Sequence, residues 1–471
     1  MNNLANVLQA QGRLAEAENF YRDALALEPE FLEALYNLGG TLQALGREEE
    51  ARECLERVLA LLLAEGSAAA QEGHYAEAAG CYERALTLKP DDPGLLDRLG
   101  VVCDAAGRHA EALAALRRSL ELRPGDAGTL FNLGMALQGE GAHAQAIEAF
   151  DQVLRVQPDN GEAALAKAIS RLSSGDFAAG WREYEVRYQG RFEYPRVSAP
   201  DLAFPMWRGE PLAGKRLLLV GEQGFGDQMQ FIRFAKVLAD MGATVDAAVD
   251  ARLQRLVASV PGVRRLVPGV PRDSRDYDYW TLLLSVPLHL GTRLETIPAP
   301  ASYASPPAGD VAKWASRLAT LPPGRPRVGL VWTGRDRKIN RTMPFEALAP
   351  LAAIDDIDFI GMQFGEPAAG SGFPRLQLGP EIGDFADQAA LVANLDLLVT
   401  VDTAIAHVAG ALGHPVWVML PFNPDWRWMR GRDDTPWYPR TRLYRQTSFG
   451  DWAGVVARVA ADLGAWKFPP R

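Results

Sequence analysis

The sequence has few cysteines, no long apolar run and no excess of positive charge. Three of its 471 residues are cysteines, and none forms a CxxC pair, so free buried thiols are expected at Cys54, Cys81 and Cys103. No apolar run approaches the ~20 residues of a membrane span, and the first residues indicate an amphipathic helix rather than a signal peptide. These absences predict a cytoplasmic protein without a membrane span.

Charge is unevenly distributed along the chain. Residues 1–188 contain 17 Lys and Arg against 30 Asp and Glu, a net charge of −13, whereas the remainder contains 32 against 29. An acidic first part and a total of −10 argue against nucleic-acid binding. The nearly neutral second part can still contain a local basic site for phosphate groups.

Glycine recurs at a nearly constant interval in the first part of the chain. The steps are 34, 27, 34, 34 and 34 residues, for Gly12, Gly46, Gly73, Gly107, Gly141 and Gly175. A small residue follows each glycine after five positions, and an aromatic residue or Leu follows after nine. This pattern resembles the tetratricopeptide repeat, in which glycine ends the first helix and the small residue lets two helices approach. It predicts an α-solenoid of six helix pairs over residues 1–188.

The 27-residue step is 7 residues short of the period, near residues 61–63. We expect the second helix of one repeat to run into the first helix of the next at this place, or the turn between these helices to be shortened. Elsewhere the first helices should line a concave face, on which polar side chains can bind an extended protein segment. The candidates are Asn3, Asn6, Asn37, Asn132 and Lys167. The alternatives are an ordinary solvated face, a spacer, or an element that forms a homodimer.

The second part of the chain alternates between strand-like and helix-like segments. Residues 189–213 are irregular and rich in proline and aromatic residues, which predicts an extended linker. Strands are expected at 216–220, 244–249, 277–284, 327–332, 358–363, 396–401 and 415–420. Helices are expected at 227–241, 251–259, 311–321, 385–395, 404–412 and 451–463. The fold class is therefore an α/β pair of Rossmann-like domains, 214–310 and 311–471, that face a cleft.

Five motifs of this part lie in or beside its predicted strands and helices. They are 221–227 (GEQGFGD), 328–334 (VGLVWTG), 383–387 (GDFAD), 401–407 (VDTAIAH) and 421–428 (PFNPDWRW). Together they resemble the heptosyltransferase-like glycosyltransferases, in the branch that carries tetratricopeptide repeats, over roughly residues 200–465. The resemblance implies a GT-B fold and an inverting enzyme that transfers a sugar from a nucleotide-sugar to an acceptor.

The resemblance makes Asp227 the candidate general base, which would take a proton from the acceptor hydroxyl. That role needs the carboxylate within ~3 Å of the hydroxyl. A purely structural interpretation is a cap of the helix that starts here, because Asp is a preferred N-cap residue.

The donor should bind on the other side of the cleft. A strand-to-helix turn at Asp402, Thr403 and Ala404 offers N–H groups and a helix dipole to a diphosphate, and His407 lies one turn further. In the resembling enzymes a cation of the loop after Thr333 neutralises the leaving phosphates, and Lys338 and Arg341 are the candidates here. Gln363 could contact the nucleotide base. The alternatives are a solvated basic loop and a His407 that only packs between helix and sheet.

Four aromatic residues near the cleft, Trp426, Trp428, Trp437 and Tyr438, could stack on a sugar or a base, although packing is the favoured interpretation. No His, Cys and carboxylate cluster with metal-binding spacing is found in the sequence, so neither a metal nor a cofactor is expected. The nucleotide-sugar is a co-substrate, and the acceptor is expected to be a protein, such as a flagellin, recruited by the repeats. The rival hypotheses are a lipid-linked or polysaccharide acceptor, and a scaffold whose transferase domain has decayed.

Overall fold

The computed structural model describes residues 1–189, 192, 197–270, 275–334, 343–363 and 372–468. The chain divides into two compact units, Met1–Pro158 and Asp159–Arg471. The sequence pattern placed the boundary at residue 188, whereas the sixth repeat groups with the second unit. The candidates Lys338 and Arg341 lie outside the described residues.

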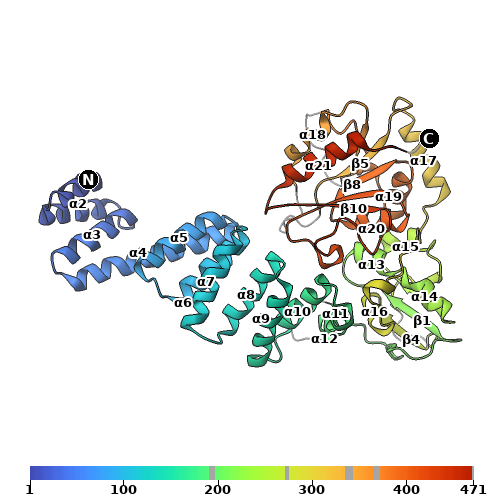
Figure 1. The fold of residues 1–471 in the computed structure, drawn as a ribbon, viewed down its shortest axis with the longest axis horizontal. Coiled ribbons are helices and arrows are strands. Elements are labelled where there is room, and N and C mark those ends of the chain that lie inside the picture. The colour runs from blue at the N-terminus through green and yellow to red at the C-terminus, as the bar shows by residue number, and fades with distance from the viewer. Residues whose placement is uncertain (190–191, 193–196, 271–274, 335–342, 364–371, 469–471) are drawn as a thin grey trace. The chain divides into compact units, whose positions relative to one another are not determined.

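The first unit is a stack of helix pairs, as the glycine spacing predicts (Figure 1). Each glycine that ends a first helix has a positive φ, from 75° at Gly12 to 88° at Gly141, a conformation that side chains disfavour. The helices are α1 (Asn2–Ala10), α2 (Leu14–Leu27), α3 (Leu32–Ala44), α4 (Glu48–Glu72), α5 (Tyr75–Leu88), α6 (Pro93–Ala105), α7 (His109–Leu122), α8 (Ala127–Glu140) and α9 (His143–Val156).

A second glycine in several first helices explains how closely each pair packs. A Cβ on Gly100 would lie 2.5 Å from Leu116 Cγ, and one on Gly134 would lie 2.5 Å from Phe150 Cε1. Leu116 and Phe150 are the large residues that the repeat pattern places nine positions after each turn glycine. They fill the groove between paired helices, and both are fully buried.

The short step of the repeat pattern is absorbed by one long helix. Helix α4 runs without interruption over 25 residues, Glu48–Glu72, and so combines the second helix of one repeat with the first helix of the next. The expected fusion is confirmed. The helix buries Val58 and Leu62 in the segment where the seven residues are missing.

The sixth repeat belongs to the second unit. Helices α10 (Gly161–Ser173), α11 (Phe177–Tyr184) and α12 (Val186–Gln189) pack on the α/β part through a buried charge cluster at Arg187. The Arg187 guanidinium donates to both carboxylate oxygens of Glu222 at 2.8 Å, to Glu185 Oε1 at 2.7 Å and to Ser285 Oγ at 2.8 Å. Burial disfavours the charge of Arg187, but these contacts outweigh it and raise the pKa of Arg187.

The described part of the linker lies against the first sheet. Met206 forms a parallel bridge with Trp280, and the Trp207 N–H donates to the Trp280 carbonyl at 2.7 Å. Trp207 is fully buried, so this segment is an integral part of the core rather than a free tether.

The first α/β half holds a parallel sheet in the order β3-β2-β1-β4. Its strands are β1 (Arg216–Val220), β2 (Thr244–Ala248), β3 (Val263–Leu266) and β4 (Tyr279–Leu282), with helices α13 (Phe225–Phe231), α14 (Phe234–Asp240), α15 (Ala251–Val257) and α16 (Val286–His289). Two details differ from the sequence prediction. The expected helix 227–241 is two helices that break at Ile232 and Arg233, and the edge strand β3 was not expected.

The second half holds a parallel sheet in the order β10-β9-β8-β5-β6-β7. The strands are β5 (Arg327–Val331), β6 (Asp358–Gly361), β7 (Leu376–Gln377), β8 (Leu397–Val401), β9 (Val416–Leu420) and β10 (Thr441–Arg445). Helices α17 (Ala308–Leu318), α18 (Ala349–Ala352), α19 (Phe385–Val392), α20 (Ala404–Ala411) and α21 (Trp452–Ala465) accompany it (Figure 1). The edge strands β7 and β10 were not expected. No helix of the described residues is long and apolar enough to cross a bilayer.

Replacing Arg187 with Met should destabilise the second unit strongly, because it leaves Glu222 and Glu185 buried without their cation. The free energy of unfolding in urea should fall by about 3–5 kcal/mol, the usual loss when one partner of a buried ion pair is removed. Arg182→Met is the matched control, since Arg182 is exposed on the neighbouring helix. Equal stability of the two variants would contradict the role given to the Arg187 cluster.

Candidate active site

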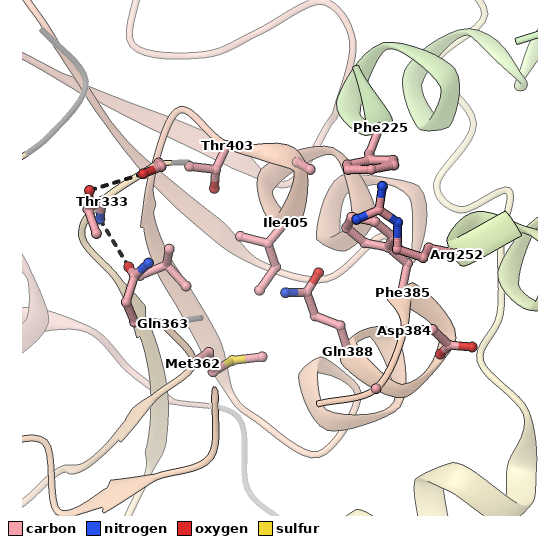
Figure 2. A pocket seen from close by; sticks show the side chains of 14 residues that line it. Phe225, Arg252, Thr333, Met362, Gln363, Asp384, Phe385, Gln388, Thr403 and Ile405 are labelled. Carbon is pink, nitrogen blue, oxygen red and sulfur yellow. Dashed lines mark hydrogen bonds between the residues drawn. The ribbon is translucent and has the colours of Figure 1, made fainter. Parts of the chain in front are cut away.

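A cavity of about 610 Å³ lies between the two α/β halves, at the carboxyl ends of their strands (Figure 2). Phe225 and Arg252 come from the first half. The remaining lining residues come from the second half: Val331, Thr333, Gly334, Met362, Gln363, Gly383, Asp384, Phe385, Gln388, Thr403, Ala404 and Ile405. Ligands of doubly wound parallel sheets bind at this edge, so the cavity is the candidate ligand site.

The start of helix α20 faces this cavity without a side-chain cap. Thr403 is the N-cap residue, but its hydroxyl bonds the Val401 carbonyl at 3.3 Å and Thr400 Oγ1 at 3.2 Å instead of the helix. The first N–H groups of α20 are therefore available to an anion, and the helix dipole adds to the attraction. The predicted residues Thr403 and Ala404 both line the cavity.

Helix α19 also begins at the cavity, but its start is already occupied. The Asp384 carboxylate accepts the Asp387 N–H at 2.8 Å, which is an N-cap bond. Arg255 of the first half donates to the other Asp384 oxygen at 2.9 Å. The negative charge at this helix start is therefore neutralised, so α20 is the better place for a phosphate.

Two apolar side chains and one buried amide lie near one another in the cavity wall. Met362 and Ile405 are the apolar side chains, and the Gln388 side chain lies beside Ile405 in Figure 2. Gln388 is 3% exposed, and its Oε1 has no hydrogen-bond partner within the described chain. Because a buried amide oxygen without a partner is costly, Gln388 is suited to accept a hydrogen bond from a ligand.

Gln363 lines the cavity as expected, and its side chain also accepts hydrogen bonds from the protein backbone. Its Oε1 accepts the Thr333 N–H at 3.1 Å (Figure 2) and the Trp332 N–H at 3.3 Å. Gln363 therefore fixes the backbone after β5, where Thr333 and Gly334 enter the cavity wall.

Arg252 is a cation of the site that sequence reasoning missed. Its guanidinium carbon lies 4.1 Å from the Phe225 ring centroid, and Phe225 in turn packs on Phe385 with centroids 5.0 Å apart. Arg252 lies just after the carboxyl end of β2, and ligands of such sheets bind at the carboxyl ends of the strands. This position could have indicated Arg252 from the sequence, but Arg252 belongs to no glycine-rich motif.

His407 is buried between the halves and does not line the cavity. Its Nδ1 is 2.9 Å from the Tyr438 hydroxyl, and its ring stacks on Trp428 with centroids 5.3 Å apart. A Cβ on Gly226 would lie 2.7 Å from His407 Cδ2, so α13 and α20 touch at this point. Asp402 is also buried, 6% exposed, and lies outside the cavity lining. His407 is held by packing, and a direct ligand contact of His407 or Asp402 stays a prediction.

Asp227 lies on α13 beside this contact, on a different side of the helix from Phe225. Its Oδ2 accepts the Gly224 N–H at 2.8 Å, and its Oδ1 forms an ion pair with Arg427 of the second half. Gly224 is the N-cap residue of α13, so Asp227 is the third helical residue rather than the expected N-cap. The Asp227 side chain keeps 20% of its surface exposed and can reach a ligand.

The aromatic residues near the cleft form a core with the sixth repeat. Trp426, Trp428, Trp437 and Tyr438 are each at most 4% exposed, and Trp426 packs edge-on against Trp181 with centroids 5.4 Å apart. The packing interpretation is confirmed, and none of the four lines the cavity.

The predicted concave-face residues are partly engaged by their neighbours. Asn6 Oδ1 accepts the Tyr21 hydroxyl at 2.7 Å and the Asn37 amide at 2.9 Å, and Asn132 donates to Asp97 at 3.1 Å. In the second unit, Lys167 pairs with Glu183 at 3.2 Å. Asn3 is exposed. The asparagines thus connect successive first helices, and a partner would have to share or displace these bonds.

No group of three or more His, Cys, Asp or Glu side chains is placed to hold a metal ion within the described ranges. Cys54, Cys81 and Cys103 are free thiols, and burial raises the pKa of each.

Comparison with known proteins confirms the repeats. Two tetratricopeptide-repeat family models match this chain, one at residues 8–63 and 105–170 and the other at residues 63–127. The first part of the chain is therefore an array of tetratricopeptide repeats, followed by two parallel sheets with their helices.

Relatives cover different parts of the chain. Protein FlbA of Caulobacter vibrioides is 29% identical over 333 residues, or 64% of this chain and 54% of FlbA, so the chain spans about half of that protein. A glycosyl transferase family 9 structure from Veillonella parvula is 12% identical, with a TM-score of 0.38 over 51% of this chain and 88% of that chain. YrrB, a tetratricopeptide-repeat protein, is 25% identical, with a TM-score of 0.24 over 35% and 89%.

Gly226→Ala should loosen the contact between the two halves. The added methyl would meet His407 Cδ2 at 2.7 Å and the Ala404 backbone at 3.5 Å, so the halves must shift. Overpacking of this kind should lower the unfolding free energy by about 1–3 kcal/mol, despite the better helix propensity of alanine. Gly309→Ala is the control, because its Cβ meets nothing within 4 Å. Urea unfolding of both variants measures the difference, and a neutral Gly226→Ala would contradict the tight contact.

Proposed function

We propose that this protein is a metal-independent, inverting GT-B glycosyltransferase. It transfers a sugar from a nucleotide-sugar to an acceptor protein. One observation carries the proposal: an uncapped helix start opens into a cavity between two Rossmann-like halves, and the helix beside it presents a partly exposed carboxylate. The motifs that resemble heptosyltransferase-like enzymes support the same assignment, since Asp227 and Thr403 lie in two of them.

The proposed donor lies along the cavity from α20 to Gln388. Its diphosphate accepts N–H groups at Ala404 and Ile405, where the positive end of the helix dipole stabilises negative charge. Lys338 or Arg341 neutralises the departing phosphates, and Arg252 adds positive charge from the first half. The base packs against Met362 and Ile405, with Gln388 accepting one of its N–H groups.

In the proposed reaction the acceptor oxygen attacks the anomeric carbon from the face opposite the diphosphate. Asp227 takes the proton of the acceptor hydroxyl as the new C–O bond forms, and the nucleoside diphosphate leaves with the electron pair of the broken bond. Because the helix start and the cations stabilise the leaving group, no metal ion is needed in this scheme.

The acceptor is proposed to be a protein, such as a flagellin, held by the repeats. A lipid-linked or polysaccharide acceptor is the second candidate, but it gives no reason for an array of tetratricopeptide repeats. A scaffold with a decayed transferase domain would not need the vacant hydrogen-bonding capacity at Gln388. We place the protein in the cytoplasm, because three free thiols suit a reducing compartment. A donor-hydrolysis assay separates the enzyme from the scaffold.

Arg252→Met and Gln388→Leu should each weaken the binding of a nucleoside diphosphate, measured by calorimetry with a panel of the common nucleotides. The loss of one polar contact should be roughly 1.5–3 kcal/mol for the charged partner and about 1 kcal/mol for the amide. Lys236→Met is the control, since this exposed lysine pairs with Asp240 on α14. Unchanged affinity in both site variants would remove the cavity from the proposal.

Asp227→Asn should abolish most transfer while leaving the fold intact. Asparagine keeps the size of the side chain and can still accept the Gly224 N–H, but it cannot take a proton. Transfer should fall by ~10²–10⁴-fold, whereas donor affinity and melting temperature should change little. If Asp227 only caps the helix, the Asn variant should transfer sugar at a nearly normal rate, and Asp227→Ala should instead lose ~0.5–2 kcal/mol of stability.

A further inference from the structure

Arg427 lies between two carboxylates at the junction of the halves. It is buried in the short helix Trp426–Trp428, with its guanidinium carbon 4.3 Å from the Trp426 ring centroid. One side of the guanidinium pairs with Asp227 of the first half. The other side donates from Nη1 to Asp425 Oδ1 at 2.8 Å. The three residues form a charge triad, Asp227–Arg427–Asp425, with one cation and two anions.

The second carboxylate changes what happens when Asp227 takes a proton. In a simple ion pair, neutralising Asp227 would leave the Arg427 cation buried without a counter-charge, which is strongly unfavourable. With Asp425 present, the protonated state still contains a balanced pair, Arg427 and Asp425. Before proton transfer, the same cation attracts the Asp227 carboxylate as an ion pair, and the Gly224 N–H donates a hydrogen bond to that carboxylate.

The loop that carries Arg427 is held firmly enough for this role. Arg445 on β10 donates to the carbonyls of Trp428 at 2.6 Å, Met429 at 2.8 Å and Arg432 at 2.9 Å. Met429 has φ 54° and ψ −169°, which is unfavourable for a non-glycine residue. Gln223, next to Gly224, has φ 57°, and its side chain contacts the Tyr184 hydroxyl at 3.1 Å. Among the described residues these two are the non-glycine positions with positive φ, and strain of this kind accompanies functional sites.

We propose that Arg427 and Asp425 are positioning residues for the base. Arg427 orients the Asp227 carboxylate across the junction of the halves, and Asp425 keeps Arg427 neutralised while Asp227 carries the acceptor proton. The inference rests on the proposed function, because it gives Asp227 the role of base. The inference also means that Asp227 can act as a base only when residues 425–428 of the second half place Arg427 and Asp425 beside it.

Asp425→Asn tests this arrangement with little change in structure. Asparagine is as good an N-cap as aspartate, and it can still accept the Arg427 N–H that Asp425 accepts at 3.0 Å. The variant should lower kcat for transfer by about 10–100-fold, a part of the 10²–10⁴-fold that a positioned base contributes. The KM for the donor and the melting temperature should stay near those of the unaltered protein. Asp434→Asn is the matched control, because Asp434 pairs with Arg432 in the same loop but is 70% exposed.

A double variant shows whether Asp425 acts through the base. If it does, the folded fraction of Asp227→Asn combined with Asp425→Asn should transfer sugar no more slowly than that of Asp227→Asn alone, since the proton acceptor is already gone. The double variant leaves Arg427 buried without a counter-charge, so urea unfolding supplies the folded fraction by which its rate is corrected. Arg427→Lys keeps the charge and should recover part of the kcat lost in Arg427→Met. Two results would overturn the inference if Asp227→Asn has lost most of its transfer. One is a double variant whose loss of transfer rate is the sum of the two single losses, and the other is an Asp425→Asn enzyme as fast as the Asp434→Asn control. A normal rate in Asp227→Asn would instead remove the proposed base itself.

Discussion

Helices α13 and α20 meet at Gly226, and three consecutive residues there face three different neighbours. Phe225 enters the cavity and packs on Phe385, Gly226 lies against the His407 ring, and Asp227 pairs with Arg427. A side chain at position 226 would separate the halves and so disturb all three contacts together. The candidate donor site and the candidate base are thus coupled by one close approach between two helices. This approach depends on the absence of a Cβ.

Charge is balanced differently around two of the arginines that are buried among the described residues, Arg187 and Arg427. Arg187 connects the sixth repeat to the glycine-rich turn through Glu222. Each nitrogen of its guanidinium donates a hydrogen bond to another group of the protein. Such a cluster stabilises a unique packing and leaves nothing for a ligand. Arg427 instead pairs with Asp227, which retains exposed surface and further lone pairs. The first arrangement suits a structural joint, and the second suits a site where protons move.

The sixth repeat follows the repeat pattern in sequence but packs with the α/β part of the chain. Its glycine and aromatic spacing continue the pattern of the preceding repeats, yet Phe177 and Trp181 pack with Trp426 and Trp437 of the α/β part. The repeat array and the proposed catalytic unit therefore share one helix pair, and a cut at residue 190 would remove part of the hydrophobic core.

The sequence by itself determined the elements that local rules control. The turn glycines need positive φ, the fused helix α4 follows from the missing residues, and the central strands β1, β5, β8 and β9 are apolar runs that a parallel sheet buries on both faces. The edge strands β3, β7 and β10 were not predicted, because β3 and β7 are short and all three carry polar residues. Tertiary structure alone decided that Arg187 and Arg427 are buried, that Arg252 lines the cavity, and that His407 packs instead of lining it. A charged side chain is polar in any sequence window. Its burial depends on partners far away in the chain, such as Glu222 for Arg187 and Asp227 for Arg427.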